Sequence, residues 1–143
     1  MILGARGLAI IRSYEKLRLK AYLPTPNDVW TIGYGHTKGV APGLTCTEAQ
    51  ALVWLREDCA EAMEAVNALT CPLTQNQYDA LVSFVFNIGG ANFASSTMRR
   101  LLEAKEYALA AGQFQRWNKQ KGVVLNGLTR RRAEEAALFN SPE

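Results

Sequence analysis

Residues 13–37 read SYEKLRLKAYLPTPNDVWTIGYGHT, and the interpretation of the whole chain starts from this stretch. It places one acid, Glu15, at the end of an apolar helical pattern, and it contains the only histidine, His36. A helix followed by a returning hairpin would bring Glu15 and Thr31 into one cleft. An acid and a hydroxyl in one cleft are typical of acid-assisted hydrolysis.

A helical pattern precedes Glu15. Leu8, Ile11 and Glu15 recur at intervals of three and four, which predicts a helix over residues 7–16 with Glu15 at the edge of its apolar face. One interpretation is a solvated glutamate at a helix end, because carboxylates are seldom buried without a partner. The other is a half-buried acid whose pKa is raised by desolvation, the state that a general acid needs.

The segment after this helix pattern predicts a small sheet. Residues 23–28 read LPTPND, which breaks a helix because proline fixes φ and lacks a donor, while Asn-Asp favours a turn. Residues 29–32 read VWTI and favour a strand. Gly33 and Gly35 allow the backbone to approach closely. We therefore expect an irregular sheet of two or three strands over residues 22–42.

Helical patterns dominate the rest of the chain. Capping-box sequences at residues 45–48 and 74–77 begin two of these helices. The expected helices are a long one to about residue 69, then residues 75–88, a short one after residues 95–97, residues 106–117 broken at Gly112, and residues 127–140. Residues 119–126 read as a polar loop. The acids expected on a solvated face of the long helix are Glu57, Asp58, Glu61 and Glu64.

Three arginines stand near the start of the last helix, where positive charge opposes the helix dipole. One explanation is that each arginine forms an ion pair with the glutamate four residues later, Arg130 with Glu134 and Arg131 with Glu135. The other is a cationic lip on a cleft, or an ion pair that holds Glu15. The sequence leaves both open.

Composition limits the possible functions. The chain has 143 residues, 48% of them hydrophobic, which suits one soluble domain with a real core. A formal net charge of +3 is too small to indicate nucleic-acid binding. Cys46, Cys59 and Cys71 match no metal motif and are expected to be reduced. We expect no metal and no cofactor, and with no apolar run near 20 residues we expect no signal peptide, anchor or stable membrane insertion.

The segments Glu15–Tyr22 and Trp30–Thr37 resemble the phage-type lysozymes, family 24 of the glycoside hydrolases. The resemblance continues through Phe86–Gly89, Ser96-Thr97, Phe114, Trp117, Gly127-Leu128 and Arg131-Arg132, and it covers nearly the whole chain. It implies a mainly helical α+β lysozyme-like fold in a single domain over residues 1–143. A small antiparallel β-lobe, about 13–45, would be joined by a long helix to a helical lobe, residues 46–143 plus the N-terminal helix, with a cleft between them.

The resemblance implies an endolysin that hydrolyses the β-1,4 bond between N-acetylmuramic acid and N-acetylglucosamine in peptidoglycan. Glu15 matches the family's catalytic acid, and Thr31 matches the threonine that helps to hold the attacking water. The family's aspartate, nine positions after the acid and six before the threonine, has no counterpart here: the first count leads to Pro24 and the second to Thr25, because the loop is one residue longer. Either Asp28 takes over its role, or Thr25 or the neighbouring Asn27 positions the water, or the site is weakened.

Further residues have two interpretations each. The candidates for sugar contact are Tyr34, Asn87, Trp117, Thr25 and Trp30. Both tryptophans could instead belong to the core, and Asn87 could instead cap a helix end. His36 could be a second general base. The simpler interpretation is structural: a hydrogen bond, such as one to an acid, would hold it and fix the sheet together with Gly33 and Gly35.

The resemblance also implies a cellular setting. The expected partner is the glycan strand of peptidoglycan, and the protein is expected to be a monomer that resides in the host cytoplasm before release onto the wall, with a holin as a functional partner. The missing aspartate keeps two alternatives open: a non-catalytic glycan-binding relative, and a lytic transglycosylase, for which one acid is sufficient.

Overall fold

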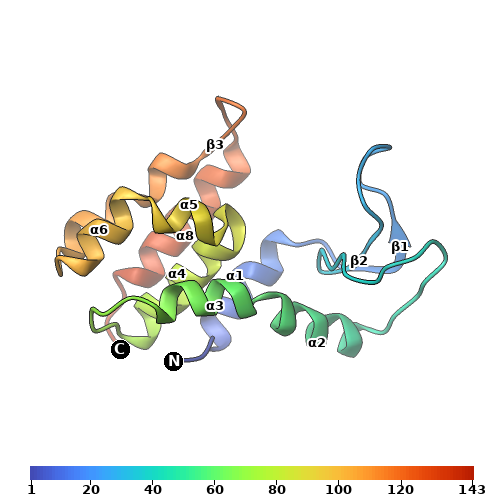
Figure 1. The fold of residues 1–143 in the computed structure, drawn as a ribbon, viewed down its shortest axis with the longest axis horizontal. Helices are drawn as coiled ribbons and strands as arrows, with labels where there is room; N and C mark the ends of the chain where they lie inside the picture. Colours follow the sequence, from blue (N-terminus) through green and yellow to red (C-terminus); the bar gives the residue numbers. More distant parts are fainter. The chain divides into compact units, whose positions relative to one another are not determined.

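The computed structural model describes residues 1–143 as two compact units, Arg12–Ala60 and Met1–Ile11 with Glu61–Glu143. The smaller unit holds β1 (Arg18–Tyr22), β2 (Thr31–Gly33) and α2 (Glu48–Asp58). Helix α1 (Ala5–Tyr14) crosses the division in the chain. From α3 onward the larger unit holds α3 (Ala60–Asn67), α4 (Gln75–Ile88), α5 (Gly90–Ala94), α6 (Thr97–Glu103), α7 (Tyr107–Ala111), the 3₁₀ helix η1 (Phe114–Trp117), β3 (Lys119–Gln120), β4 (Val123–Val124) and α8 (Asn126–Phe139) (Figure 1). None of these helices is long and apolar enough to cross a membrane.

The sheet of the smaller unit begins earlier in the chain than the sequence predicted. Strand β1 pairs antiparallel with β2, Arg18 opposite Gly33 and Tyr22 opposite Thr31, with an irregularity between these pairs. The prediction over residues 22–42 therefore missed most of β1, because its first three residues are exposed and two of them, Arg18 and Lys20, are charged and give little strand signal. The residues between the strands form the Pro-containing loop.

Helix α2 packs on β2 at a glycine. Gly33 has φ of +65°, and a Cβ there would lie 3.1 Å from the Cβ of Ala51. Close approach and a left-handed backbone thus both require glycine at this position.

The prediction of one long helix to about residue 69 is wrong, because α2 ends at Asp58 and a new helix, α3, begins at Ala60. The backbone N–H of Cys59 bonds to the carbonyls of both Leu55 and Glu57, which tightens the last turn. Cys59 is buried, and the apolar pattern continues through the break without a Gly or Pro. Periodicity alone therefore could not reveal it.

Helix α4 is the core of the larger unit, as its sequence predicted. The expected capping box is present, with Thr74 and Gln77 each bonding the other's backbone N–H. Helix α4 packs against α8, which also contacts η1. Phe84 of α4 meets Phe114 of η1 edge to face at 5.2 Å, and Phe114 meets Phe139 of α8 at 5.7 Å. These rings join the three elements in one core.

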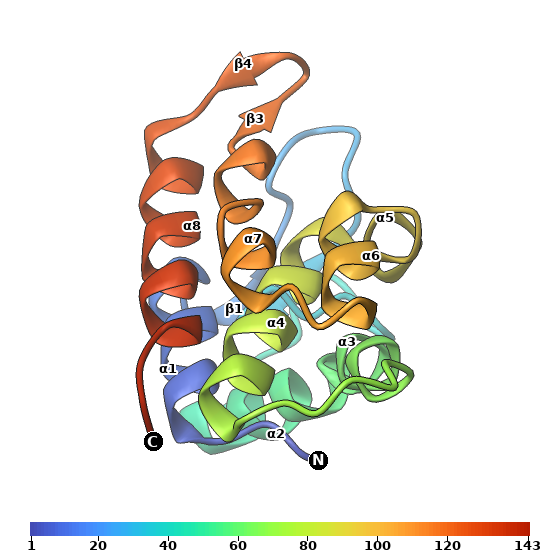
Figure 2. The same cartoon turned by 90° about the vertical axis from the view of Figure 1, so that its left-hand side faces the viewer.

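Residues 119–126 are not a loop as expected, because they contain the β3–β4 hairpin. Lys119 pairs with Val124 and Gln120 with Val123. The two residues between the strands, Lys121 and Gly122, have φ of +50° and +79°, the left-handed values of a type I′ hairpin turn. The hairpin extends beyond the end of α8 (Figure 2). The short helix α5 after Gly89 was also unexpected, while the break at Gly112 was predicted correctly.

Candidate active site

Glu15 lies immediately after α1 and is half-buried. Its Oε2 would be 3.0 Å from a Cβ placed on Gly35, whose φ is +81°. The carboxylate therefore lies directly against a glycine backbone that has no room for a side chain. This contact brings together the first and last parts of the stretch that the sequence singled out.

Thr31, the second expected catalytic residue, is a buried residue of β2. Its hydroxyl donates a hydrogen bond to the carbonyl of Val29 at 3.0 Å. Because the hydroxyl proton is used in this bond, the Thr31 oxygen is oriented to accept a hydrogen bond from another group.

Asp28 belongs to a turn in the loop between the strands. Its backbone N–H donates to the carbonyl of Thr25 at 3.0 Å, and its carboxylate Oδ1 accepts the N–H of Val29 at 2.9 Å. This is the local bonding by which Asp stabilises turns. Thr25 and Asp28 are both exposed.

Tyr34 is buried between α1 and α2. The guanidinium of Arg12 lies 5.6 Å from the ring centroid and donates to the hydroxyl at 3.3 Å. The hydroxyl in turn donates to Glu48 at 3.5 Å, and Arg12 lies 3.7 Å from the same carboxylate. A role in sugar contact remains a prediction for Tyr34, and its burial favours a structural one.

His36 is buried against α2. Its Nδ1 lies 2.8 Å from Oδ2 of Asp58, and its ring stacks on Trp54 at 4.6 Å with an interplanar angle of 7°. Asp58 is therefore not part of a solvated acidic face, and that expectation was wrong. A one-dimensional helix pattern could not show that its partner lies on the sheet. A structural role for His36 stays a proposal, which this contact supports.

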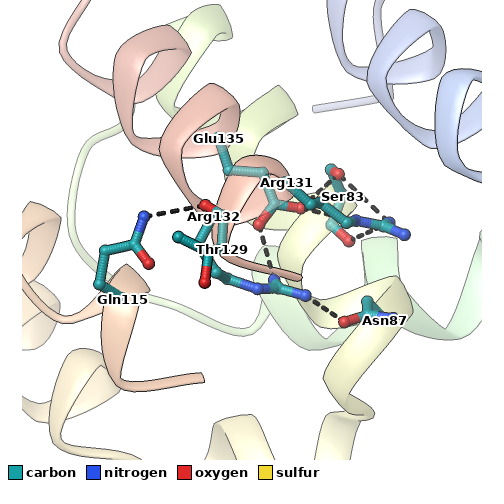
Figure 3. Close-up of polar contacts among 7 residues, drawn as sticks. All are labelled: Ser83, Asn87, Gln115, Thr129, Arg131, Arg132 and Glu135. Atoms are coloured by element: carbon teal, nitrogen blue, oxygen red, sulfur yellow. Dashed lines mark hydrogen bonds and ion pairs between the residues drawn. The ribbon is translucent and has the colours of Figure 1, made fainter. Parts of the chain in front are cut away.

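The larger unit contains a buried polar network between α4 and α8 (Figure 3). Glu135 accepts hydrogen bonds from Arg131 at 3.2 Å, from Arg132 at 2.6 Å and from the hydroxyl of Ser83 at 2.5 Å. Desolvation raises the pKa of the Glu135 carboxyl, and the charge of Arg132 opposes that shift. The pairing of Arg131 with Glu135 was predicted correctly. A cationic lip is wrong for Arg131 and Arg132, because both are buried.

Arg132 connects this network to a surface pocket. It donates to Oδ1 of Asn87, and its guanidinium lies 4.9 Å from the ring of Phe84, which meets Trp117 edge to face at 6.0 Å. Asn87 and Trp117, two expected sugar contacts, line one pocket of about 370 Å³. Its other walls include Asn92, Lys119 and Gln120, which sequence reasoning missed because they come from α5 and the unrecognised hairpin.

A family model described as phage lysozyme matches residues 12–135 of this chain. The chain belongs to the phage lysozyme family. It is 46% identical to the endolysin of Bacillus phage PZA over 99% of its own length and 56% of that protein, so it spans about half of that relative. It is 41% identical to the endolysin of Salmonella phage P22, with 99% of each chain covered.

Solved structures agree with this family assignment. The muramidase domain of SpmX from Asticaccaulis excentricus matches with a TM-score of 0.90 and 41% identity over 98% of each chain. A mutant of P22 lysozyme matches with a TM-score of 0.88 and 39% identity over 99% of each chain. The expected α+β lysozyme-like fold is confirmed.

The loop between β1 and β2 contains a single acid, Asp28, and Pro24 in the same loop can serve neither as a base nor as a nucleophile. A base from this loop would therefore be Asp28, and otherwise the proton must go to a group elsewhere in the chain or to water.

Proposed function

We propose that this protein is an endolysin muramidase, which hydrolyses the β-1,4 bond between N-acetylmuramic acid and N-acetylglucosamine in peptidoglycan strands. The observation that carries the proposal is the half-buried carboxylate of Glu15, packed on Gly35 beside the segment that contains Thr31. The names of the relatives, endolysins and lysozymes over nearly the whole chain, support the same activity.

Glu15 is the proposed general acid. In its protonated form it gives its proton to the glycosidic oxygen as the bond to the sugar C1 breaks, and an oxocarbenium-like transition state develops. A water molecule then attacks C1 from the opposite face, so that the configuration inverts. The proton that the water loses goes to a base or to solvent.

Thr31 is proposed to orient that water. Its hydroxyl already donates to Val29, so it accepts an O–H of the water and turns a lone pair of the water oxygen toward C1. Two versions of the site differ in the base. In one, the Asp28 carboxylate leaves its turn and receives the proton. In the other, which the bond of Asp28 to Val29 favours, Thr25 assists Thr31 and solvent takes the proton.

The deciding experiment is clearing of purified sacculi, together with the release of reducing ends, by the wild type, Glu15→Gln and Asp28→Asn. Removal of a general acid is expected to lower the rate by about 10²–10⁴-fold, so Glu15→Gln should be inactive on this scale. Loss of activity in Asp28→Asn as well would assign the base role to Asp28. Full activity of Asp28→Asn would indicate that Thr31 and Thr25 orient the attacking water without a carboxylate.

A second candidate function is non-catalytic binding of peptidoglycan, favoured by Pro24 at the position of the family's aspartate. It predicts sedimentation of the wild type with sacculi and no release of reducing ends. Products with anhydro-muramyl ends, which mass spectrometry distinguishes from hydrolysed ends, would instead assign lytic transglycosylase chemistry.

The cellular setting is part of the proposal. As an endolysin, the protein would be a monomer that accumulates in the host cytoplasm and reaches peptidoglycan with the help of a holin. Lysis timing in cells that express the protein with and without a holin tests this dependence, because a holin-dependent endolysin gives no lysis alone.

A further inference from the structure

The β3–β4 hairpin exposes an apolar segment. Val123 is 60% exposed, Val124 50% and Leu125 38%, so three consecutive apolar residues face water in β4 and directly after it. Single exposed apolar residues are normal on a protein surface, whereas a contiguous group of them marks a surface that contacts something other than water. None of the three lines the pocket that contains Asn87 and Trp117.

The two valines lie on opposite faces of the hairpin, because successive side chains of a strand point to opposite sides. Both Val123 and Val124 are nevertheless exposed. A sheet that packs on a core or on a flat partner covers one face and shows polar residues on the other. Here neither face is covered, and each carries a valine. This arrangement suits an apolar medium that surrounds the hairpin better than a partner that covers one side of it.

The base of the hairpin is held by hydrogen bonds. The backbone N–H of Leu125 donates to the carbonyl of Asn118 at 3.0 Å, and the side chain of Asn118 donates to the Thr129 hydroxyl at 3.2 Å. The side chain of Gln115 donates to the Thr129 carbonyl at 3.0 Å, which links η1 to α8. Figure 2 shows the hairpin projecting past the N-terminal end of α8. The valines are therefore presented by a fixed and accessible element.

Positive charge is concentrated in the hairpin and in the elements on either side of it. Residues 107–133 contain six cations and no acid, so the rest of the chain, within a total of +3, has a net charge of −3. Two of the six, Arg131 and Arg132, are buried against Glu135. The four exposed cations are Arg116, Lys119, Lys121 and Arg130. A cationic surface without acids attracts an anionic one.

We infer that the β3–β4 hairpin binds the surface of a lipid bilayer that contains anionic phospholipid. Val123, Val124 and Leu125 enter the boundary between headgroups and acyl chains, and the exposed cations contact the phosphates. The long side chain of Lys121 keeps its ammonium group at the level of the headgroups while the turn is immersed. Binding of this kind is shallow and reversible and needs no spanning segment. It is independent of the proposed muramidase activity, because a lipid bilayer contains no glycan strand.

The test is co-sedimentation with vesicles, either of phosphatidylcholine alone or of phosphatidylcholine and phosphatidylglycerol in equal parts. The main variant is the double substitution Val123→Thr and Val124→Thr. Threonine keeps the branched Cβ that favours a strand and adds a hydroxyl, and both positions are exposed, so the thermal midpoint should change by only a few degrees. Val53→Thr, at a valine of α2 that is also 50% exposed, is the matched control.

The wild type and Val53→Thr are expected to sediment with the anionic vesicles and much less with phosphatidylcholine alone. The partition coefficient of the double valine variant should fall by about tenfold, which corresponds to the burial of about one complete valine side chain. Lys121→Gln should lower partition into the anionic vesicles by about fivefold, the contribution of one cation near such a surface. Lys38→Gln, at an exposed lysine outside residues 107–133, should have little effect.

Three results would overturn the inference. The first is a wild type that does not sediment with the anionic vesicles. The second is equal partition of the wild type and the double valine variant, including the case in which only Lys121→Gln reduces binding, because a surface that uses charge alone fits a soluble anionic polymer. The third is an equal loss in Val53→Thr, which would show that exposed valines contribute to partition wherever they lie.

Discussion

The two units place their polar residues in different ways. In the smaller unit, Glu15, Thr31 and Gly35 come from one continuous stretch, and the carboxylate rests on a backbone that is bare of side chains. In the larger unit, Ser83 and Glu135 meet from α4 and α8, helices far apart in the sequence, and Glu135 pairs with the buried Arg131 and Arg132. The first arrangement sets an acid against backbone within one stretch of sequence. The second pairs buried charges between and along helices and uses them to hold other groups.

Breaking the network of the larger unit should have the largest effect on stability. Glu135→Gln removes the charge that compensates two buried guanidiniums, and loss of one partner from a buried ion pair costs about 3–5 kcal/mol. Chemical denaturation of the variant measures this loss. Glu134→Gln, an exposed neighbour on the same helix, is the control and should change the free energy of unfolding by less than about 0.5 kcal/mol. Equal small losses in both variants would show that the network contributes little.

Disturbing the contact between Glu15 and Gly35 in the smaller unit should instead lower activity. Gly35→Ala adds a Cβ 3.0 Å from Oε2 of Glu15, so the carboxylate must shift slightly, and the rate should fall by less than the roughly 10²-fold that a misplacement of about 1 Å costs. The control is Gly39→Ala, where φ is +70° and nothing lies within 4 Å of the added atom. Both variants should lose about 1 kcal/mol of stability from the left-handed backbone. Only Gly35→Ala should lose activity in the sacculus-clearing assay, and equal activities would contradict a positioning role for Gly35.

The variant His36→Asn tests whether the role of His36 is structural or catalytic. It removes the stack on Trp54 and weakens the contact with Asp58, so about 1–3 kcal/mol of stability should be lost while the folded variant keeps its activity within a few-fold. Unfolding curves and clearing rates measured on the same samples separate the two effects. A large drop in rate without a loss of stability would make His36 part of the chemistry.

The smallest expected effect is a pH-dependent one in the larger unit. The pKa of Glu103 is lowered, first because its carboxylate accepts the backbone N–H of Thr70 and also through the N–H of Cys71. A lowered pKa in the folded state gives stability that is present above the unfolded value, about 4.3, and is lost as the pH falls through the folded value. The thermal midpoint of Glu103→Gln should therefore lie below that of the wild type at pH 7, and the gap should narrow as the pH is lowered through the acid range. Glu106→Gln, which leaves the bonds of Glu103 to Thr70 and Cys71 in place, is the control.

Much of the fold could be predicted because its signals are local. The capping box at Thr74, the apolar α4 and the break at Gly112 depend on neighbouring residues alone. The errors have a physical cause as well. The end of α2 at Asp58 has no Gly or Pro to mark it, and the β3–β4 hairpin turns at Lys121 and Gly122, where only one of the two left-handed residues is a glycine.

The candidate site was predictable to the extent that it follows the family pattern. The resemblance proposed Glu15 and Thr31 as catalytic residues and predicted that no aspartate stands nine positions after Glu15, where the sequence has Pro24. It could not show that the Asp28 carboxylate bonds to its own turn, or that Tyr34 is buried, because both depend on how the chain folds back on itself.

The sequence by itself determined the family and the helical character of the chain, because these depend on residue types at short spacing, and for the same reason it could propose Glu15 as the acid. Only the tertiary structure decided which partners the polar groups have. Asp58 of α2 meets His36, and Arg132 of α8 donates to the side-chain oxygen of Asn87 in α4. The reason is physical: a hydrogen bond is fixed by distance and direction in space, and these partners lie many residues apart along the chain.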